Sequence, residues 1–428
     1  MSKTPDKKVN KLTKMMKNVK ICRDFYEGAV KVLVDEYLPK LTGETDASYK
    51  IRCASTAFPN FYSPIVTGLS GLITKKEPVT EGFETFPLND IDMKGNSFAN
   101  FVKQVCDSSI IAGVEFISVE SNRANNQVFF KRYSYEQLNS YNIEDGKLIQ
   151  IVFKETLEEA EGRFGIKEVE RFIVFKLGGG EVWYDTGEGL RVQETWSNAL
   201  IEIPVVAVIT GKELSRFEYV PRLYDVAMLN KVMLNLESQL ANVLSVVGNP
   251  IPVFYGEIAD DGVRIGVKDA LVFNDKQTQG FEYVEIEGGG VSKLQDKIKK
   301  VGEDIDKTSF SLLHKDGSKT VIDAQENQNK SSSFLSDVAE ELEVKFNKLF
   351  QLMGMLDNKI IDKGNIIKFK KDFDDVLFSD QQLKMLYEML EGGHLSRETF
   401  WNKLKLANIL PKSFDPSTEK ENIESDLV

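Results

Sequence analysis

Two segments of the sequence repeat apolar residues at the alternating spacing of three and four that marks one face of a long helix. The first lies within residues 223–247, runs for three heptads and stops at Gly248 and Pro250. Its apolar positions are Val226, Leu229, Met233, Leu236, Leu240, Val243 and Val247. The second uses Val291, Leu294, Ile298, Val301, Ile305, Thr308 and Leu312. Other helices must cover such stripes, so the sequence predicts two long, packed helices.

The segments around these helices differ in character. Residues 251–287, between the helices, are rich in β-forming residues and predict a small β subdomain. Residues 314–333, HKDGSKTVIDAQENQNKSSS, have Val321, Ile322 and Ala324 as their only apolar side chains. We expect a long polar loop there, which in a compact domain is usually functional or disordered. A long helix is expected to follow it.

The N-terminal half predicts helices followed by strands. Apolar periodicity indicates helices over 12–38 and 48–73, the second interrupted by prolines, and over 97–112 with Ser97 as its N-cap. Residues 114–210 contain short β-rich runs separated by turn signals, which predict an antiparallel β domain.

Residues 1–23 carry eight basic side chains and one acid, Asp6. A solvated helix face is the favoured interpretation, and a contact with nucleic acid or a scaffold is the second. The eight are Lys3, Lys7, Lys8, Lys11, Lys14, Lys17, Lys20 and Arg23.

Composition narrows the class of protein. The 428 residues, 42% hydrophobic and 28% charged, are typical of a globular chain, and a net charge of −12 argues against a general nucleic-acid binder. Cys22, Cys53 and Cys106 form neither a disulfide framework nor a metal motif. No signal peptide is evident, so we expect synthesis in the reducing cytoplasm.

No catalytic or cofactor-binding pattern emerges. The GSKT at 317–320 lacks the spacing of a phosphate-binding loop, and His314 and His394 are the only histidines. We therefore expect no enzyme activity, no metal and no cofactor. Asp225, Lys231 and Glu237 would be costly in a bilayer, which disfavours a membrane anchor at 223–247.

Four segments, taken in order, resemble the portal (head–tail connector) proteins of tailed bacteriophages. YKIRCASTAFPNFYSPIVTGLSGLITKKEP at 49–78 is similar to a portal wing segment through Tyr49, Arg52, Ala57, Gly68, Gly71 and Pro78. Residues 234–256 resemble a stem helix entering a clip, residues 318–354 a tunnel loop and long helix, and residues 392–426 the closing segment of the family.

This resemblance implies an α+β portal fold assembled as a ring. It assigns 1–215 to a wing, 216–249 and 291–313 to two stem helices, and 250–290 to a β-rich clip. It assigns 314–333 to a tunnel loop and 334–428 to a long kinked helix with the C-terminal wing or a short crown.

The resemblance also gives roles to residues. The DNA contacts in the channel would be made by Lys315, Lys319 and Lys330. The acids Asp323 and Glu326 would keep the net attraction for DNA weak. Asp260, Asp261, Arg264 and Lys268 would dock partners at the clip. The stem positions Val226, Leu229, Met233, Leu236, Leu240, Val243, Ile298 and Ile305 would contact neighbouring copies.

The resemblance implies that the chain forms a DNA channel at one capsid vertex of the virion. The channel would be a ring, with twelve subunits expected. Double-stranded DNA would pass through it without sequence recognition during packaging and ejection. The implied partners are the terminase motor, a head-completion or tail adaptor, and the major capsid or scaffold protein, with no membrane. The alternative is an intracellular coiled-coil adaptor without a channel.

Overall fold

The structure, a computed structural model, describes most of the chain. The residues outside this description are 1–3, 123–124, 186–188, 248–250, 256–279, 285–288, 310–320, 358, 360, 362–365, 372, 374–379, 407–409, 411–413 and 420–428.

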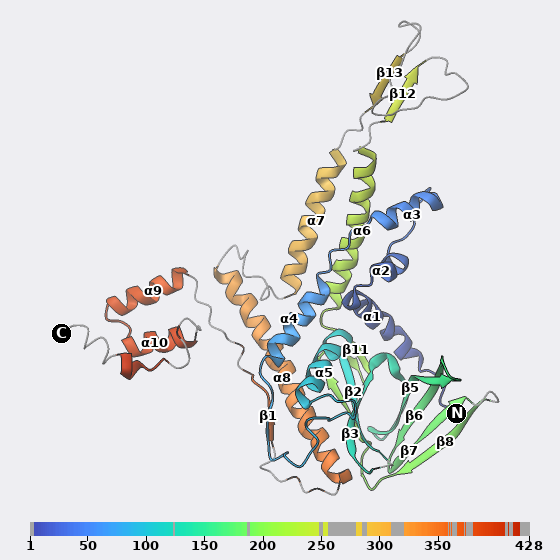
Figure 1. The fold of residues 1–428 in the computed structure, drawn as a ribbon. Helices are drawn as coiled ribbons and strands as arrows, with labels where there is room; N and C mark the ends of the chain where they lie inside the picture. Colours follow the sequence, from blue (N-terminus) through green and yellow to red (C-terminus); the bar gives the residue numbers. More distant parts are fainter. Residues whose placement is uncertain are drawn as a thin grey trace.

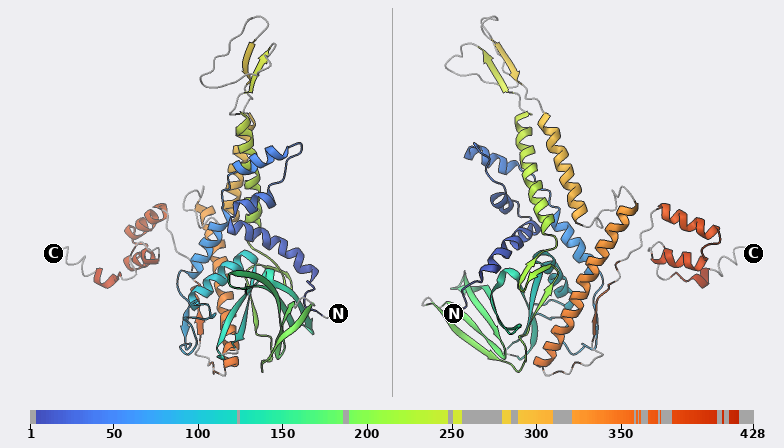
Figure 2. Two further views of the ribbon diagram at one scale, coloured as in Figure 1. Left: turned by 45° about the vertical axis from the view of Figure 1, so that its right-hand side comes forward. Right: turned by 180° about the vertical axis from the view of Figure 1, so that it is seen from behind.

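The chain forms a body of helices and β-sheets from which two long helices project (Figure 1). The projecting helices are α6 (Tyr224–Val247) and α7 (Gly289–Thr308). At their far end lie β12 (Ile251–Tyr255) and β13 (Gly280–Val284), paired antiparallel. Figure 2 shows the same arrangement from two further sides. The fold is therefore a mixed α+β fold with a body and a projecting stalk.

The expected helix over 12–38 is two helices, α1 (Asn10–Glu27) and α2 (Val30–Tyr37). Gly28 separates them with a left-handed φ of 65°, and its N–H closes α1 on the Asp24 carbonyl. Glycine adopts this conformation without a Cβ clash, which makes it a common helix end. The apolar periodicity continues on both sides of Gly28, so the sequence pattern gave no sign that the helix ends there.

The expected block over 48–73 is also two helices, α3 (Asp46–Ser55) and α4 (Tyr62–Thr74). Pro59 lies in the connection, whereas Pro64 is tolerated in the first turn of α4, where N–H groups have no intrahelical acceptor. The helix expected after Ser97 is α5 (Phe98–Ala112), and the Ser97 side chain accepts from the Asn100 N–H as an N-cap.

The β-rich region forms two antiparallel sheets, as the runs in 114–210 predicted. The first has the order β3-β2-β9 and the second the order β4-β5-β6-β7-β8. The strands are β2 (Val114–Ser121), β3 (Val128–Ser134), β4 (Leu138–Glu144), β5 (Lys147–Glu161), β6 (Gly165–Lys176), β7 (Gly179–Asp185), β8 (Leu190–Ser197) and β9 (Val205–Ile209). The short helix η1 (Tyr135–Gln137) joins β3 to β4.

Two strand pairs were not predicted. A hairpin of β10 (Lys212–Ser215) and β11 (Glu218–Val220) precedes α6, where residues 216–223 had been grouped with the stem. Its turn contains Phe217 at a left-handed φ of 67°, and no glycine marks it. The second pair, β1 (Val79–Glu81) with β14 (Ile366–Lys368), joins segments too distant for a local signal.

The long helix α8 (Val321–Asp357) begins earlier than expected. The prediction of a loop over 314–333 is therefore wrong from Val321 onward. The segment 321–333 has no glycine or proline, and extending a helix that is already formed avoids the cost of nucleation. Two further helices, α9 (Asp380–Glu391) and α10 (Arg397–Leu406), lie apart from the body (Figures 1 and 2).

The body is held by an aromatic cluster around α8. Phe346 and Phe350 are fully buried. The ring centroid of Phe98 lies 5.2 Å from that of Phe346, and the centroid of Phe83 lies 4.5 Å from that of Phe350. Aromatic pairs at these separations add to the gain from burial, so α8 is anchored to the body through this cluster.

Candidate functional site

The candidate site is the projecting pair α6 and α7, which we call the stem. The two helices lie side by side from the body to β12 and β13 (Figures 1 and 2). No other part of the described chain extends so far from the body while carrying two heptad stripes. Its geometry therefore bears most directly on what the chain binds.

Near the body, apolar side chains of the α6 and α7 stripes are buried within one chain. Val226 and Ile305 are 0% exposed and Met233 is 2% exposed, all in the main hydrophobic core. The prediction that these three side chains contact a neighbouring copy is therefore wrong, because α6 and α7 cover each other's stripes. A heptad stripe shows that a helix is covered but does not show which helix covers it.

Other apolar positions of the stem are less completely covered, from Leu229 near the body to Val243 near the far end of α6. Leu229, Leu236 and Ile298 are half-buried against the core. Leu240 and Val243 are also half-buried. Val232 is 41% and Leu244 is 47% exposed. The two helices therefore leave apolar surface of α6 uncovered, which further helices could cover.

The outer face of α7 is charged. Lys293, Lys297, Lys300 and Lys307 are exposed and spaced by four, three and seven residues, which places them on one stripe of the helix. The exposed acids Asp296 and Glu303 lie beside this stripe. Across α7, five lysines against four acids leave a net charge of +1. The helix therefore presents cations on one line without a large net attraction for anions.

A buried asparagine fixes the base of the stem. Asn230 of α6 is 0% exposed, and its Oδ1 accepts from the backbone N–H groups of Phe61 and Tyr62 at 3.0 Å each. Its Nδ2 donates to the Pro59 carbonyl at 2.9 Å. One side chain thus hydrogen-bonds backbone groups at the start of α4 and in the connection before it. These bonds hold α6 against the N-terminal helices.

A buried ion pair adds a second clamp. Arg52 of α3 is 2% exposed and donates to both carboxylate oxygens of Glu44 at 2.8 Å. It also donates to the Ser238 hydroxyl of α6 at 2.9 Å. The Arg52 hydrogen bond, with the Leu41 N–H and the nearby charges after it, lowers the pKa of Glu44 to about 2. The pair therefore stays ionised at neutral pH and holds α3 against α6.

The sequence did not identify these clamps as such. Arg52 was noted only for its place in a wing-like segment, and Asn230 was not singled out. The contacts of α6 that they make join residues 186 and 169 positions apart, Arg52 with Ser238 and Asn230 with Phe61. A polar residue on a helix that is otherwise apolar is the one signal that could have pointed to Asn230.

Most of the predicted DNA-contact and docking residues fall outside the described part of the chain. Lys315 and Lys319 do so, as do the expected clip contacts Asp260, Asp261, Arg264 and Lys268. Asp323, Glu326 and Lys330 lie on α8 instead of a loop. These assignments stay predictions.

The described residues offer neither a metal site nor a membrane span. Among them, no group of three or more His, Cys, Asp or Glu side chains could hold a metal ion. None of the described helices is long and apolar enough to cross a membrane.

Comparison with known proteins gives one family match and several similar structures. Residues 222–355, which include the stem, match a domain of unknown function, DUF4055. No curated protein matches the sequence.

The similar solved structures include the neck of an empty gene transfer agent (GTA) particle, at 11% identity and a TM-score of 0.46, covering 90% of this chain and 100% of that chain. They also include an HK97 family phage portal protein from Corynebacterium diphtheriae, at 11% identity and a TM-score of 0.34, covering 72% of this chain and 91% of that one. Portal and neck proteins are thus among the structures that this chain resembles.

Proposed function

We propose that this chain is a portal protein, the head–tail connector of a tailed phage or a related particle. In this proposal copies of the chain close into a ring, with twelve as the expected number, at one vertex of the capsid. The stems of all copies surround a central channel. DNA enters through this channel during packaging and leaves through it during ejection.

The incomplete burial of apolar side chains on α6 is the observation that carries the proposal. Val232 and Leu244 are exposed and Leu240 and Val243 are half-buried in a single chain. Stems of neighbouring copies arranged around an axis would cover these side chains, and a closed ring leaves no copy with an uncovered side. The order of the portal-like segments in the sequence supports the same arrangement.

The lysine stripe of α7 is the surface that we assign to the channel. Lys293, Lys297 and Lys300 repeated around a ring would form layers of positive charge that touch phosphates of any sequence. The acids beside them keep the net charge of α7 near zero, which favours sliding over tight binding, because many neutralised phosphates make a complex strong. Lys315, Lys319 and Lys330 are proposed to extend these contacts.

The far end of the stem is proposed as the docking end. The strands β12 and β13 prolong the two helices away from the body. A position at the tip of a ring of stems suits contact with the terminase motor and later with a tail adaptor. Asp260, Asp261, Arg264 and Lys268 are the proposed contacts, and the body is proposed to meet the capsid shell.

The ring is tested with a double substitution, Val232→Asp together with Leu244→Asp. Both side chains are exposed in one chain, so the variant should fold with an unchanged thermal unfolding midpoint. The carboxylates would be buried without partners in a ring, so the variant should remain monomeric when the wild type assembles. Sedimentation velocity reports both species, and Leu177→Asp, an exposed apolar residue on the body, is the control. A wild type that is monomeric at micromolar concentration contradicts the proposal.

The channel surface is tested by replacing Lys293, Lys297 and Lys300 with Gln in an infectious system. Rings should still form, while filled heads should lose DNA more often than the wild type. Lys299→Gln is the matched control, because Lys299 is exposed on another side of the same helix. Equal DNA retention in the triple variant and the control would contradict this assignment.

A further inference from the structure

A long hairpin leaves the second sheet and ends in exposed apolar side chains. Strands β5 and β6 pair from Gln150↔Lys176 out to Glu161↔Gly165. Beyond the pair Glu155↔Arg171 their side chains are mostly exposed. We call residues 156–170 the ribbon. A two-stranded ribbon by itself is marginally stable in water, so this one would gain stability from contact with another surface.

The tip of the ribbon carries the most exposed aromatic side chain of the body. Phe164 is 89% exposed and Ile166 is 68% exposed. The Arg163 guanidinium lies over the Phe164 ring at 5.0 Å from its centroid. Single exposed apolar residues are ordinary, but two together at the end of a projecting hairpin form a knob that could enter a hollow.

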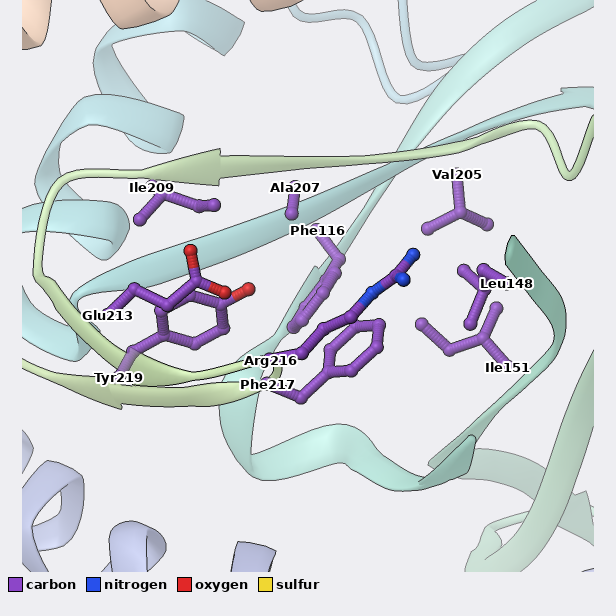
Figure 3. Close-up of a pocket in the computed structure, with 10 residues that line it drawn as sticks. All are labelled: Phe116, Leu148, Ile151, Val205, Ala207, Ile209, Glu213, Arg216, Phe217 and Tyr219. Atoms are coloured by element: carbon purple, nitrogen blue, oxygen red, sulfur yellow. The ribbon is translucent and has the colours of Figure 1, made fainter. Parts of the chain in front are cut away.

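A hollow of suitable character lies elsewhere on the body. It has a volume of about 310 Å³ and lies between the two sheets and the β10–β11 hairpin (Figure 3). Its wall is mostly apolar, and the exposed Glu213 and Arg216 line it as well. Its apolar lining is Phe116, Leu148, Ile151, Val205, Ala207, Ile209 and Phe217, joined by Tyr219. This volume is at the lower end of the range for binding pockets, which suits a side chain more than a large ligand.

The ribbon cannot reach the hollow of its own chain. Leu148 and Ile151 line the hollow from the first half of β5, whereas the tip follows Glu161 at the end of the same strand. Ten residues of extended strand separate Ile151 from Glu161, about 33 Å at 3.3 Å per residue. Any contact between tip and hollow must therefore be made between two copies.

The charges of the two surfaces are complementary. The ribbon has five acids and two bases, a net charge of −3, with Glu158 directly opposite Glu168. Like charges in opposed positions destabilise a hairpin. Beside the hollow, α1 packs along β11, and Lys11 lies 3.5 Å from Glu218. The Ser215 hydroxyl, followed by the charges of Lys11 and Lys14, lowers the pKa of Glu218. Exposed lysines of α1 thus border the hollow.

We infer that the ribbon of one copy docks on the body of the next copy in the ring. Phe164 enters the hollow, Arg163 faces Glu213, and the acidic ribbon lies along the lysines of α1. The inference rests on the proposed ring and adds its head-to-tail contact, which joins two different surfaces as closed rings require. In this contact the basic N-terminal segment would bind the acidic ribbon of the neighbouring copy. The proposed channel gives that segment no role.

The first test is Phe164→Asp, compared with Ile201→Asp. Both residues are exposed apolar side chains, Ile201 at 92%, so neither substitution should lower the thermal unfolding midpoint of the monomer. Phe164→Asp should raise the concentration at which rings half-dissociate at least tenfold, and Ile201→Asp should leave it unchanged. Arg163→Glu should weaken the ring as well, and adding Glu213→Arg should restore it.

The second test is a disulfide between copies that does not depend on ring formation. In a Cys53→Ser background, protein with Arg163→Cys is mixed with protein with Glu213→Cys under mild oxidation. A cross-linked pair is expected from the mixture and not from Lys154→Cys mixed with Glu213→Cys. Rings that survive Phe164→Asp, together with no cross-link, overturn the docking and leave the ring intact. A monomeric wild type that still cross-links contradicts the ring and keeps the docking.

Discussion

The body and the stem differ in how far one chain completes them. In the body, Phe346, Phe350 and their aromatic neighbours are fully buried, so a single copy contains its whole core. In the stem, apolar side chains of α6 stay exposed in one copy, Val232 at 41% beside the buried Met233 and Leu244 at 47% farther along the helix. The aromatic cluster of the body is therefore packed within one copy, whereas α6 leaves apolar side chains exposed in one copy.

This difference has a structural cause at the junction. Asn230 joins α6 to α4, and Ser238 joins it to Arg52 of α3, so α6 is held to the N-terminal helices at these two positions. Asn230 and Arg52 stabilise one chain, whereas the exposed apolar side chains of α6 are the ones that we propose to stabilise an assembly.

The largest effect on a single chain is expected in the body. Phe346→Ala should lower the free energy of unfolding by about 3–5 kcal/mol, because it leaves a cavity among packed rings. Urea denaturation of the monomer measures this. Val344→Ala, two residues away and 55% exposed, should change the stability little. Equal effects of the two substitutions would show that α8 is not anchored as described.

Two substitutions along the stem should separate its lower and upper halves. Met233→Ala should destabilise the monomer by about 2–5 kcal/mol, as for other buried side chains. Leu240→Ala, at a half-buried position, should cost the monomer clearly less and the ring more. Urea denaturation gives the first quantity, and the dissociation concentration of the ring gives the second. The opposite ranking would break the comparison between the two halves.

The junction should show an intermediate effect. Asn230→Leu leaves the buried N–H groups of Phe61 and Tyr62 without their acceptor, at a cost of about 1–3 kcal/mol. Hydrogen exchange should become faster at the start of α4 and remain unchanged within the β3-β2-β9 sheet. Gln239→Leu, at an exposed position of the same helix, is the control and should leave the exchange pattern unchanged.

The smallest effect is a pH dependence at the Arg52 clamp. Folding lowers the pKa of Glu44 from 4.5 to about 2, so its carboxylate binds protons more readily in the unfolded chain. The stability that it contributes is complete above pH 4.5 and is lost as the pH falls towards 2. The advantage of wild type over Glu44→Gln in urea denaturation should therefore shrink between pH 5 and pH 3. An advantage that does not change with pH would contradict the lowered pKa.

Local patterns predicted much of the fold. The heptads located α6 and α7, Ser97 located α5, and the β-rich runs located most strands of the two sheets. Patterns failed where a contact is distant or a break is subtle, as at Gly28, at the glycine-free turn of β10 and β11, and at the early start of α8. For the candidate site, the sequence located the stem but assigned Val226, Met233 and Ile305 to a neighbour. Periodicity could not show that the covering helix belongs to the same chain.

Electron cryomicroscopy of the purified full-length protein tests the central claim most directly. The account predicts a closed ring in which the α6 and α7 stems of all copies surround an open channel, with Val232 and Leu244 covered by neighbouring stems. Single copies at micromolar concentration, or rings in which the stems point away from the axis and remain separate, would contradict it.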